Sequence, residues 1–163
     1  MSERNTTFYG KYRGIVTDNQ DPLKSGRVKA RVPDVLGDRI SGWALPATPY
    51  AGRGVGLYLI PPTGASVWIE FEHGDPDFPI WSGCFWADQK DLPVEADDPK
   101  VKVLKTDSAT ITLDDLAQAI TITTANSEIT LLRDCIVIQH QHSAVIKLAG
   151  PTVSINKDAL EVT

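Results

Sequence analysis

The chain has 163 residues, 42% of them apolar and 23% charged, a balance that is ordinary for a folded protein and argues against a disordered chain. Its formal net charge of −5 argues against a general binder of nucleic-acid phosphates and gives no attraction to anionic lipid. Its start is polar and no apolar run approaches the ~20 residues that cross a bilayer, so we expect synthesis and folding in the cytoplasm.

The first half of the chain predicts a small, partly closed β-barrel. In residues 27–33, Val28, Ala30 and Val32 alternate with basic side chains, as expected for a half-buried strand, and residues 65–75 alternate in the same way. Glycine and proline mark turns between such runs. Further strands are expected at residues 10–18, 42–46, 54–62 and 79–86. Short strands joined by loops within about 80 residues are typical of a small barrel.

A change of composition divides the chain near residue 95. All the aromatic residues lie between Phe8 and Trp86, and residues 87–163 contain none. Residues 87–100 are acidic and carry two prolines, which suits a solvated linker. We therefore predict an N-terminal domain that includes the start of the linker, residues 1–94, and a second domain, residues 95–163.

The second half predicts a ladder of short strands rich in isoleucine, valine and threonine, with no helical period. The strands are expected at residues 100–104, 109–113, 119–124, 127–132, 135–142, 144–148, 151–155 and 159–163. Large apolar residues share a parity within a strand, as Ile120 does with Ile122, and Ile129 with Leu131. One face of the predicted sheet is therefore an apolar stripe.

This stripe is too small a core for a single chain. A buried isoleucine or valine contributes about 1.5–3 kcal/mol, whereas ordering each residue costs about 1–2 kcal/mol of backbone entropy. With one large apolar side chain in every two or three residues, a single copy hardly becomes stable. We therefore predict a homo-oligomer that buries its isoleucine and valine stripe on the symmetry axis.

Two histidines continue this stripe. His140 and His142 keep the parity of Ile136 and Ile138, so their rings are expected on the face assigned to the axis. A buried imidazole without a partner costs at least about 1–3 kcal/mol. Three-fold symmetry would gather six rings into an octahedral transition-metal site, whereas two-fold symmetry would gather four and favour zinc or copper. Alternatively, both rings lie in solvent near a strand end.

A series of turn and core residues in the first half carries a resemblance to a known family. The series, spread over about residues 9–86, is Asp21-Pro22, Gly26-Arg27-Val28, Trp43, Gly64, Val67, Phe71, Gly74-Asp75, Pro79 and Gly83. In order and spacing it resembles the N-terminal OB-fold domain of phage baseplate spike proteins. That family includes baseplate assembly protein V of contractile-tail phages and the VgrG spikes of type VI secretion.

The resemblance implies an all-β fold, with an N-terminal OB-fold barrel followed by a C-terminal intertwined trimeric β-helix, or needle. Short members of the family carry a His-x-His motif whose six histidines bind one iron ion on the axis, and His140-Gln141-His142 matches that motif. The resemblance thus favours three chains over two and implies an octahedral iron site at His140 and His142. Another transition metal would suit the same ligands, and the ion would lie either at the apex or inside the needle.

These predictions describe a central spike of a contractile phage tail or related injection system, not an enzyme. It would be assembled into a virion tail baseplate or injection particle, bind baseplate hub and tail tube proteins and a tip protein, meet the target cell envelope transiently, and bind no nucleic acid.

The competing interpretation is an OB-fold binding module for single-stranded nucleic acid or glycan, with aromatic side chains for stacking. These aromatics are Trp43, Tyr50, Tyr58 and Trp68. A polysaccharide-cleaving β-helix would need many more residues than the second half provides.

Cys84 and Cys135 lack metal-ligand spacing and are expected to be small buried apolar residues.

Overall fold

The computed structural model describes residues 6–95, 98–141, 143–156 and 159–162. Contacts between residues divide the chain into two units, Met1–Ala87 and Asp88–Thr163. By this division the linker segment that the sequence analysis assigned to the first domain groups with the second unit. Within the second unit, Lys105 Nζ donates a hydrogen bond of 2.6 Å to Glu95 Oε1, which holds the pKa of the Glu95 carboxyl below its ordinary value.

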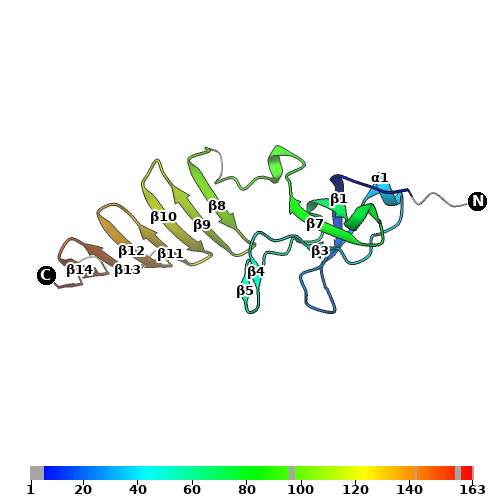
Figure 1. Cartoon of the computed structure of the whole chain (residues 1–163). Coiled ribbons are helices and arrows are strands. Elements are labelled where there is room, and N and C mark those ends of the chain that lie inside the picture. Colours follow the sequence, from blue (N-terminus) through cyan, green and yellow to red (C-terminus); the bar gives the residue numbers. More distant parts are fainter. Residues whose placement is uncertain (1–5, 96–97, 142, 157–158, 163) are drawn as a thin grey trace, which may run out of the picture. The chain divides into compact units, whose positions relative to one another are not determined.

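The fold is all-β, as the sequence predicts (Figure 1). Its helical segments are short: α1 (Pro33–Leu36), η1 (Glu72–Gly74) and η2 (Gln89–Asp91). Among the residues that the structure describes, no helix has the length and apolar content that a membrane crossing requires.

The first unit is a small barrel, with strand order β2-β1-β6-β7-β3. The strands are β1 (Tyr12–Asp18), β2 (Lys29–Arg31), β3 (Leu45–Pro46), β6 (Ser66–Phe71) and β7 (Pro79–Cys84). Neighbours are antiparallel except β3 and β7, which are parallel. The Val28–Ala44 and Arg31–Ile40 bridges connect β2 to the segment before β3, so the two ends of the sheet meet.

The barrel interior follows from alternation along its strands. In β6, Val67 and Ile69 are fully buried and Phe71 is nearly so, whereas Trp68 and Glu70 between them are half-buried. Val28, Ala30 and Val32, which the sequence places inward in and beside β2, are likewise buried. Each of these aliphatic side chains contributes about 1.5–3 kcal/mol, so the barrel carries a core of its own.

An ion pair fixes the turn that precedes β2. The Asp21 carboxylate accepts hydrogen bonds from the Arg27 guanidinium, with Nε at 3.1 Å, and from the backbone N–H groups of Leu23 and Ser25. The guanidinium, followed by these backbone donors, holds the pKa of Asp21 well below its usual range despite the opposing effect of desolvation. The turn is further fixed by the buried Trp81 indole, which donates to the Gly26 carbonyl at 3.1 Å. These contacts account for Asp21 and Arg27 in the sequence pattern.

The strand expected at residues 54–62 is absent from the barrel. In its place β4 (Ala51–Gly52) and β5 (Val55–Gly56) form a separate two-stranded hairpin, drawn in cyan in Figure 1. All residues from 49 to 59 are exposed, and we call this segment the arm. The prediction was wrong because an apolar run has the same appearance in a buried strand and in a protruding hairpin.

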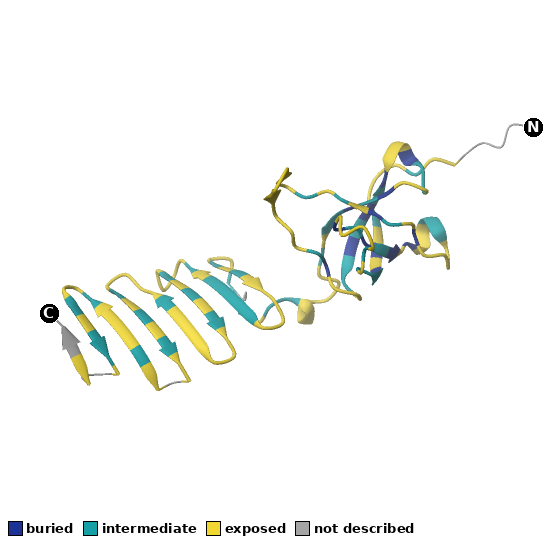
Figure 2. Cartoon of the chain, turned by 90° about the horizontal axis from the view of Figure 1, so that it is seen from below, coloured by how far each residue is buried: buried dark blue, intermediate teal, exposed yellow. Residues whose placement is uncertain are grey.

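The second unit is one eight-stranded antiparallel sheet in which every strand pairs with the next along the chain (Figure 1). Its strands are β8 (Val101–Lys105), β9 (Ala109–Asp114), β10 (Ala119–Thr124), β11 (Ser127–Leu131), β12 (Cys135–His140), β13 (Ala144–Ala149), β14 (Thr152–Ile155) and β15 (Leu160–Val162). All eight strands predicted for this half are present. Figure 2 shows no buried residue in this sheet, whose described residues are intermediate or exposed.

Candidate functional site

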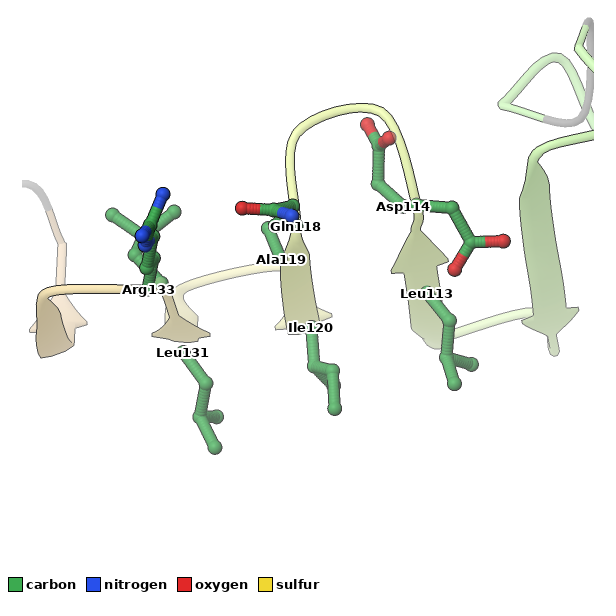
Figure 3. Close-up of a pocket in the computed structure, with 9 residues that line it drawn as sticks. Leu113, Asp114, Gln118, Ala119, Ile120, Leu131 and Arg133 are labelled. Carbon is green, nitrogen blue, oxygen red and sulfur yellow. The ribbon is translucent and has the colours of Figure 1, made fainter.

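One face of the second unit collects the large aliphatic side chains. In the strand register, Ile122 lies opposite Ile111 on one side and Ile129 on the other. Ile120 lies in the same way between Leu113 and Leu131. Figure 3 shows these last three side chains pointing to the same side of the sheet, beside a shallow hollow. Cross-strand pairing thus aligns the stripes of separate strands into continuous rows.

These rows extend along the sheet from β8 to β14, and we call them the apolar face. Its side chains are each between 36% and 47% exposed in the single chain: Leu104, Leu113, Ile120, Ile122, Ile129, Leu131, Ile136, Ile138, Ile146, Leu148 and Val153. Contiguous apolar surfaces of this extent are rare on monomeric proteins and are typical of interaction surfaces. The shared parity predicted from sequence is confirmed for these residues.

The opposite face of the sheet is different in composition. Thr121 lies opposite Thr112 and Thr130, forming a row of hydroxyl-bearing side chains across three strands. Val103 and Val137 continue that row. The prediction of a joint isoleucine and valine stripe was therefore wrong in part, since these valines share the threonine face while the apolar face is built mainly from isoleucine and leucine.

His140 ends strand β12 with the parity of Ile136 and Ile138, and its ring is exposed. It lies opposite Ser127 and Ala144, in the row next to the apolar rows. Its Nδ1 is 2.8 Å from Ser127 Oγ, a hydrogen bond that engages one ring nitrogen. The sequence placed His140 on this face correctly. His142 lies outside the described residues.

The residues around His140 meet the needs of the expected metal ion only in part. Among the described residues of one chain, no three histidine, cysteine or acidic side chains gather as a metal site. The hydrogen bond of Nδ1 to Ser127 leaves Nε2 as the ring nitrogen directed to other ligands, an arrangement that is common for metal-bound histidine. One chain therefore supplies a ligand of suitable type but no complete site, and the iron site at His140 and His142 remains a prediction.

The two tryptophans expected to stack bases or sugars contact side chains of their own chain. Trp43 has Lys29 Nζ at 4.9 Å and the Arg27 guanidinium at 5.6 Å from its ring centroid. Trp68 packs against Phe85 in a tilted arrangement with 4.6 Å between ring centroids. These rings are partly covered by neighbours of their own chain, and the two tyrosines of the predicted set lie on the arm.

Cys84 was expected to be buried, but it is exposed at the end of β7, where it lines a groove between the barrel and the arm. Cys135 is half-buried, and both cysteines are free. Sequence reasoning missed this groove because its walls come from four separate segments of the first unit. It also missed Ser127, whose role becomes visible only through the register of β11 and β12.

Two family models match the chain. Residues 12–86 match the "Type VI secretion system/phage-baseplate injector OB domain". Residues 100–161 match the "Phage baseplate V C-terminal trimerisation domain". The chain belongs to the phage baseplate V family of spike proteins. The OB-fold barrel of this family member is thus the first unit, and its trimerisation domain is the sheet that carries the apolar face.

Curated proteins similar to this chain include two spike proteins of Pseudomonas aeruginosa. The type VI secretion system spike protein VgrG5 is 38% identical over 88 residues, which are 51% of this chain and 11% of the relative. The type VI secretion system spike protein VgrG4b is 40% identical over 58 residues, which are 36% of this chain and 7% of the relative. The chain therefore spans only a small part of the length of these two relatives.

Proposed function

We propose that this chain is the central spike of a contractile phage tail or a related contractile injection system, and that it acts as a homotrimer. The observation that carries the proposal is the apolar face, which runs over seven consecutive strands and stays more than one-third exposed in a single chain. Three copies would bury these faces against one another about a shared axis, which agrees with the trimerisation domain matched by this half.

The work of such a spike is mechanical, namely piercing the target cell envelope. An antiparallel sheet with short connections resists bending when its apolar face is packed, because every strand is held by hydrogen bonds to its neighbours. In a trimer, pairing between chains would also cover the free edges of each sheet. Spike and baseplate proteins of this family are generally not enzymes, and we propose no catalytic role. The expected partners are baseplate hub and tail tube proteins, and a tip protein.

An ion at His140 and His142 would link the three chains at the end of strand β12, with three further strands of the sheet beyond it. We propose that these six imidazoles hold one iron ion, and that Ser127 orients the His140 ring by its hydrogen bond to Nδ1. The ion would supply cross-linking rather than redox chemistry. Its binding needs unprotonated imidazole, so acid that protonates these rings should release it.

The oligomeric state tests the main proposal. Light scattering coupled to gel filtration should give three times the chain mass of 17.8 kDa, and the mass should persist at micromolar dilution. A folded species of one-chain mass would contradict the proposal and favour the binding module instead. That alternative has little electrostatic support in nucleic acid, because the first 87 residues contain nine lysines and arginines against nine acidic residues.

Elemental analysis tests the metal site. The parent trimer, purified without chelators, should carry about one ion for three chains, and His140→Ala/His142→Ala should carry none. Lys147→Ala provides a control on a neighbouring strand that should keep the ion. A metal-free parent of three-chain mass would remove the ion from the proposal while leaving the spike intact.

A further inference from the structure

The arm of the first unit is an apolar hairpin whose residues are all exposed in the single chain. Five large apolar side chains on it are more than half exposed: Tyr50, Val55, Leu57, Tyr58 and Leu59. Its backbone pairing beyond β4 and β5 includes the Leu57 N–H donating to the Tyr50 carbonyl at 2.9 Å. A two-stranded hairpin is marginal in water by itself, so this arm needs a surface against which to pack.

A groove lies beside the base of the arm, with a volume of about 510 Å³. The barrel contributes Gly26, Pro46, Ile60, Trp81 and Cys84 to its lining, and the arm forms its other wall. Among the described residues that line the groove, none carries a charge. The groove therefore suits an uncharged, apolar occupant, since a charged group would lose its hydration there without a partner.

The shape of a three-fold assembly indicates which occupant to expect. In a ring of three identical subunits each contact joins two different patches, so a subunit must present a complementary pair of surfaces. The first unit presents both a protruding apolar arm and an uncharged apolar groove. Arg53 at the turn between β4 and β5 is the only charged residue within residues 49–59, and an interface core is typically depleted of charge in this way.

The short segment between β7 and β8 favours contact between the arm of one chain and the groove of another. Residues 85–100 separate β7 from β8, so the barrels of three chains joined through their second units remain tethered close to one another. A tether of this length gives an effective concentration on the order of millimolar. Even a contact that is too weak to hold free subunits together would then be populated.

We propose that the arm of each chain occupies the groove on the barrel of a neighbouring chain, so that the three barrels form a closed ring. The contact rests on the proposed trimer, which supplies the proximity. Tyr50 and Tyr58 are its expected anchors, because buried aromatic side chains dominate the energy of small interfaces. The ring would fix the barrels relative to one another without any contribution from the apolar face of the second unit.

Site-directed cross-linking of the full chain tests the arrangement. In a Cys135→Ser background, Arg53→Cys places a thiol at the arm tip, and Cys84 remains in the groove. The two thiols are joined by a short bis-maleimide near neutral pH, where the reagent is selective for thiols over lysine amines. Covalent dimers and trimers on a denaturing gel are expected. Asp38→Cys, at an exposed position that follows α1 and is not part of the arm, should give at least about tenfold less product.

Two further measurements make the outcome decisive. Tyr58→Ser in the Arg53→Cys background should reduce cross-linking about tenfold, which corresponds to a loss of ~1.4 kcal/mol in docking. Light scattering of each variant reports the mass independently. A mass of three chains with products confined to single chains, or with equal product from both cysteine positions, would overturn the arm contact and leave the spike proposal standing. A mass of one chain would overturn both.

Discussion

Replacing Ile122 by alanine should destabilise the trimer, whereas replacing its neighbour Thr121 should not. Both residues lie in the middle of β10, with opposite parity and with cross-strand partners on both sides. Backbone pairing and strand propensity are therefore closely matched between the two positions. The difference between the two variants isolates the direction in which the side chain points.

The magnitude follows from exposure in the single chain. Ile122 is 39% exposed, so roughly two-fifths of the ~3 kcal/mol that full burial gives remains to be gained on association, or ~1 kcal/mol per chain. Over three chains this is ~3 kcal/mol, about a hundredfold in the association constant. The cavity that alanine leaves adds to the loss, and isoleucine-to-alanine changes in packed cores cost ~2–5 kcal/mol. Thr121→Ala should cost under ~1 kcal/mol, within the range of strand propensity.

Guanidinium unfolding followed by circular dichroism, at several protein concentrations, provides the assay. The parent and Thr121→Ala should unfold at similar midpoints that rise with concentration, as expected for a trimer that unfolds to monomers. Ile122→Ala should unfold at a clearly lower midpoint. Equal midpoints for the two variants, or midpoints independent of concentration, would refute the assignment of the apolar face to a subunit interface.

Three further predictions concern the barrel, and tryptophan fluorescence follows its unfolding in each case. Because the folded pKa of Asp21 is depressed, its pairing with Arg27 stabilises the barrel above the ordinary aspartate pKa of 3.8, and this stability is lost as pH falls below that value. Asp21→Asn should lower the unfolding midpoint at neutral pH and remove this part of the acid sensitivity. An unchanged dependence of stability on acid pH would contradict the prediction. Trp81→Phe removes the hydrogen bond to Gly26 and should cost about 1–3 kcal/mol, because the carbonyl loses a buried donor; no loss would show that water replaces the indole. Ile69→Val should cost about 0.5–1.5 kcal/mol, since the side chain is fully buried, and a neutral result would indicate a loosely packed core.

The strands of the second unit were predictable because their signal is local. Isoleucine at every second position fixes which side chains share a face, and each strand pairs with its immediate neighbour in the sequence, as β10 does with β9 and β11. The same parity placed His140 correctly on the apolar face. The valine at position 137 departs from the joint stripe because parity, rather than residue type, decides the face.

The arm was not predictable from its own residues. The run at 54–62 is as apolar as a buried strand, but the barrel closes through the Val28–Ala44 bridge and leaves no place in the sheet for it. The groove beside the arm and the exposure of Cys84 are further results of that closure. Each depends on segments distant in sequence, which no local pattern brings together.

The sequence by itself determined the all-β class, the change of character between the halves, the eight strands of the second unit and the side of the sheet on which isoleucine lies. These properties follow from period-two alternation and composition, which act within a few residues. The tertiary structure alone decided how the barrel closes, which apolar run is left outside it and which hydroxyl contacts His140. Those outcomes depend on which distant segments compete for the same backbone hydrogen bonds and the same buried volume, and this competition takes place only in three dimensions.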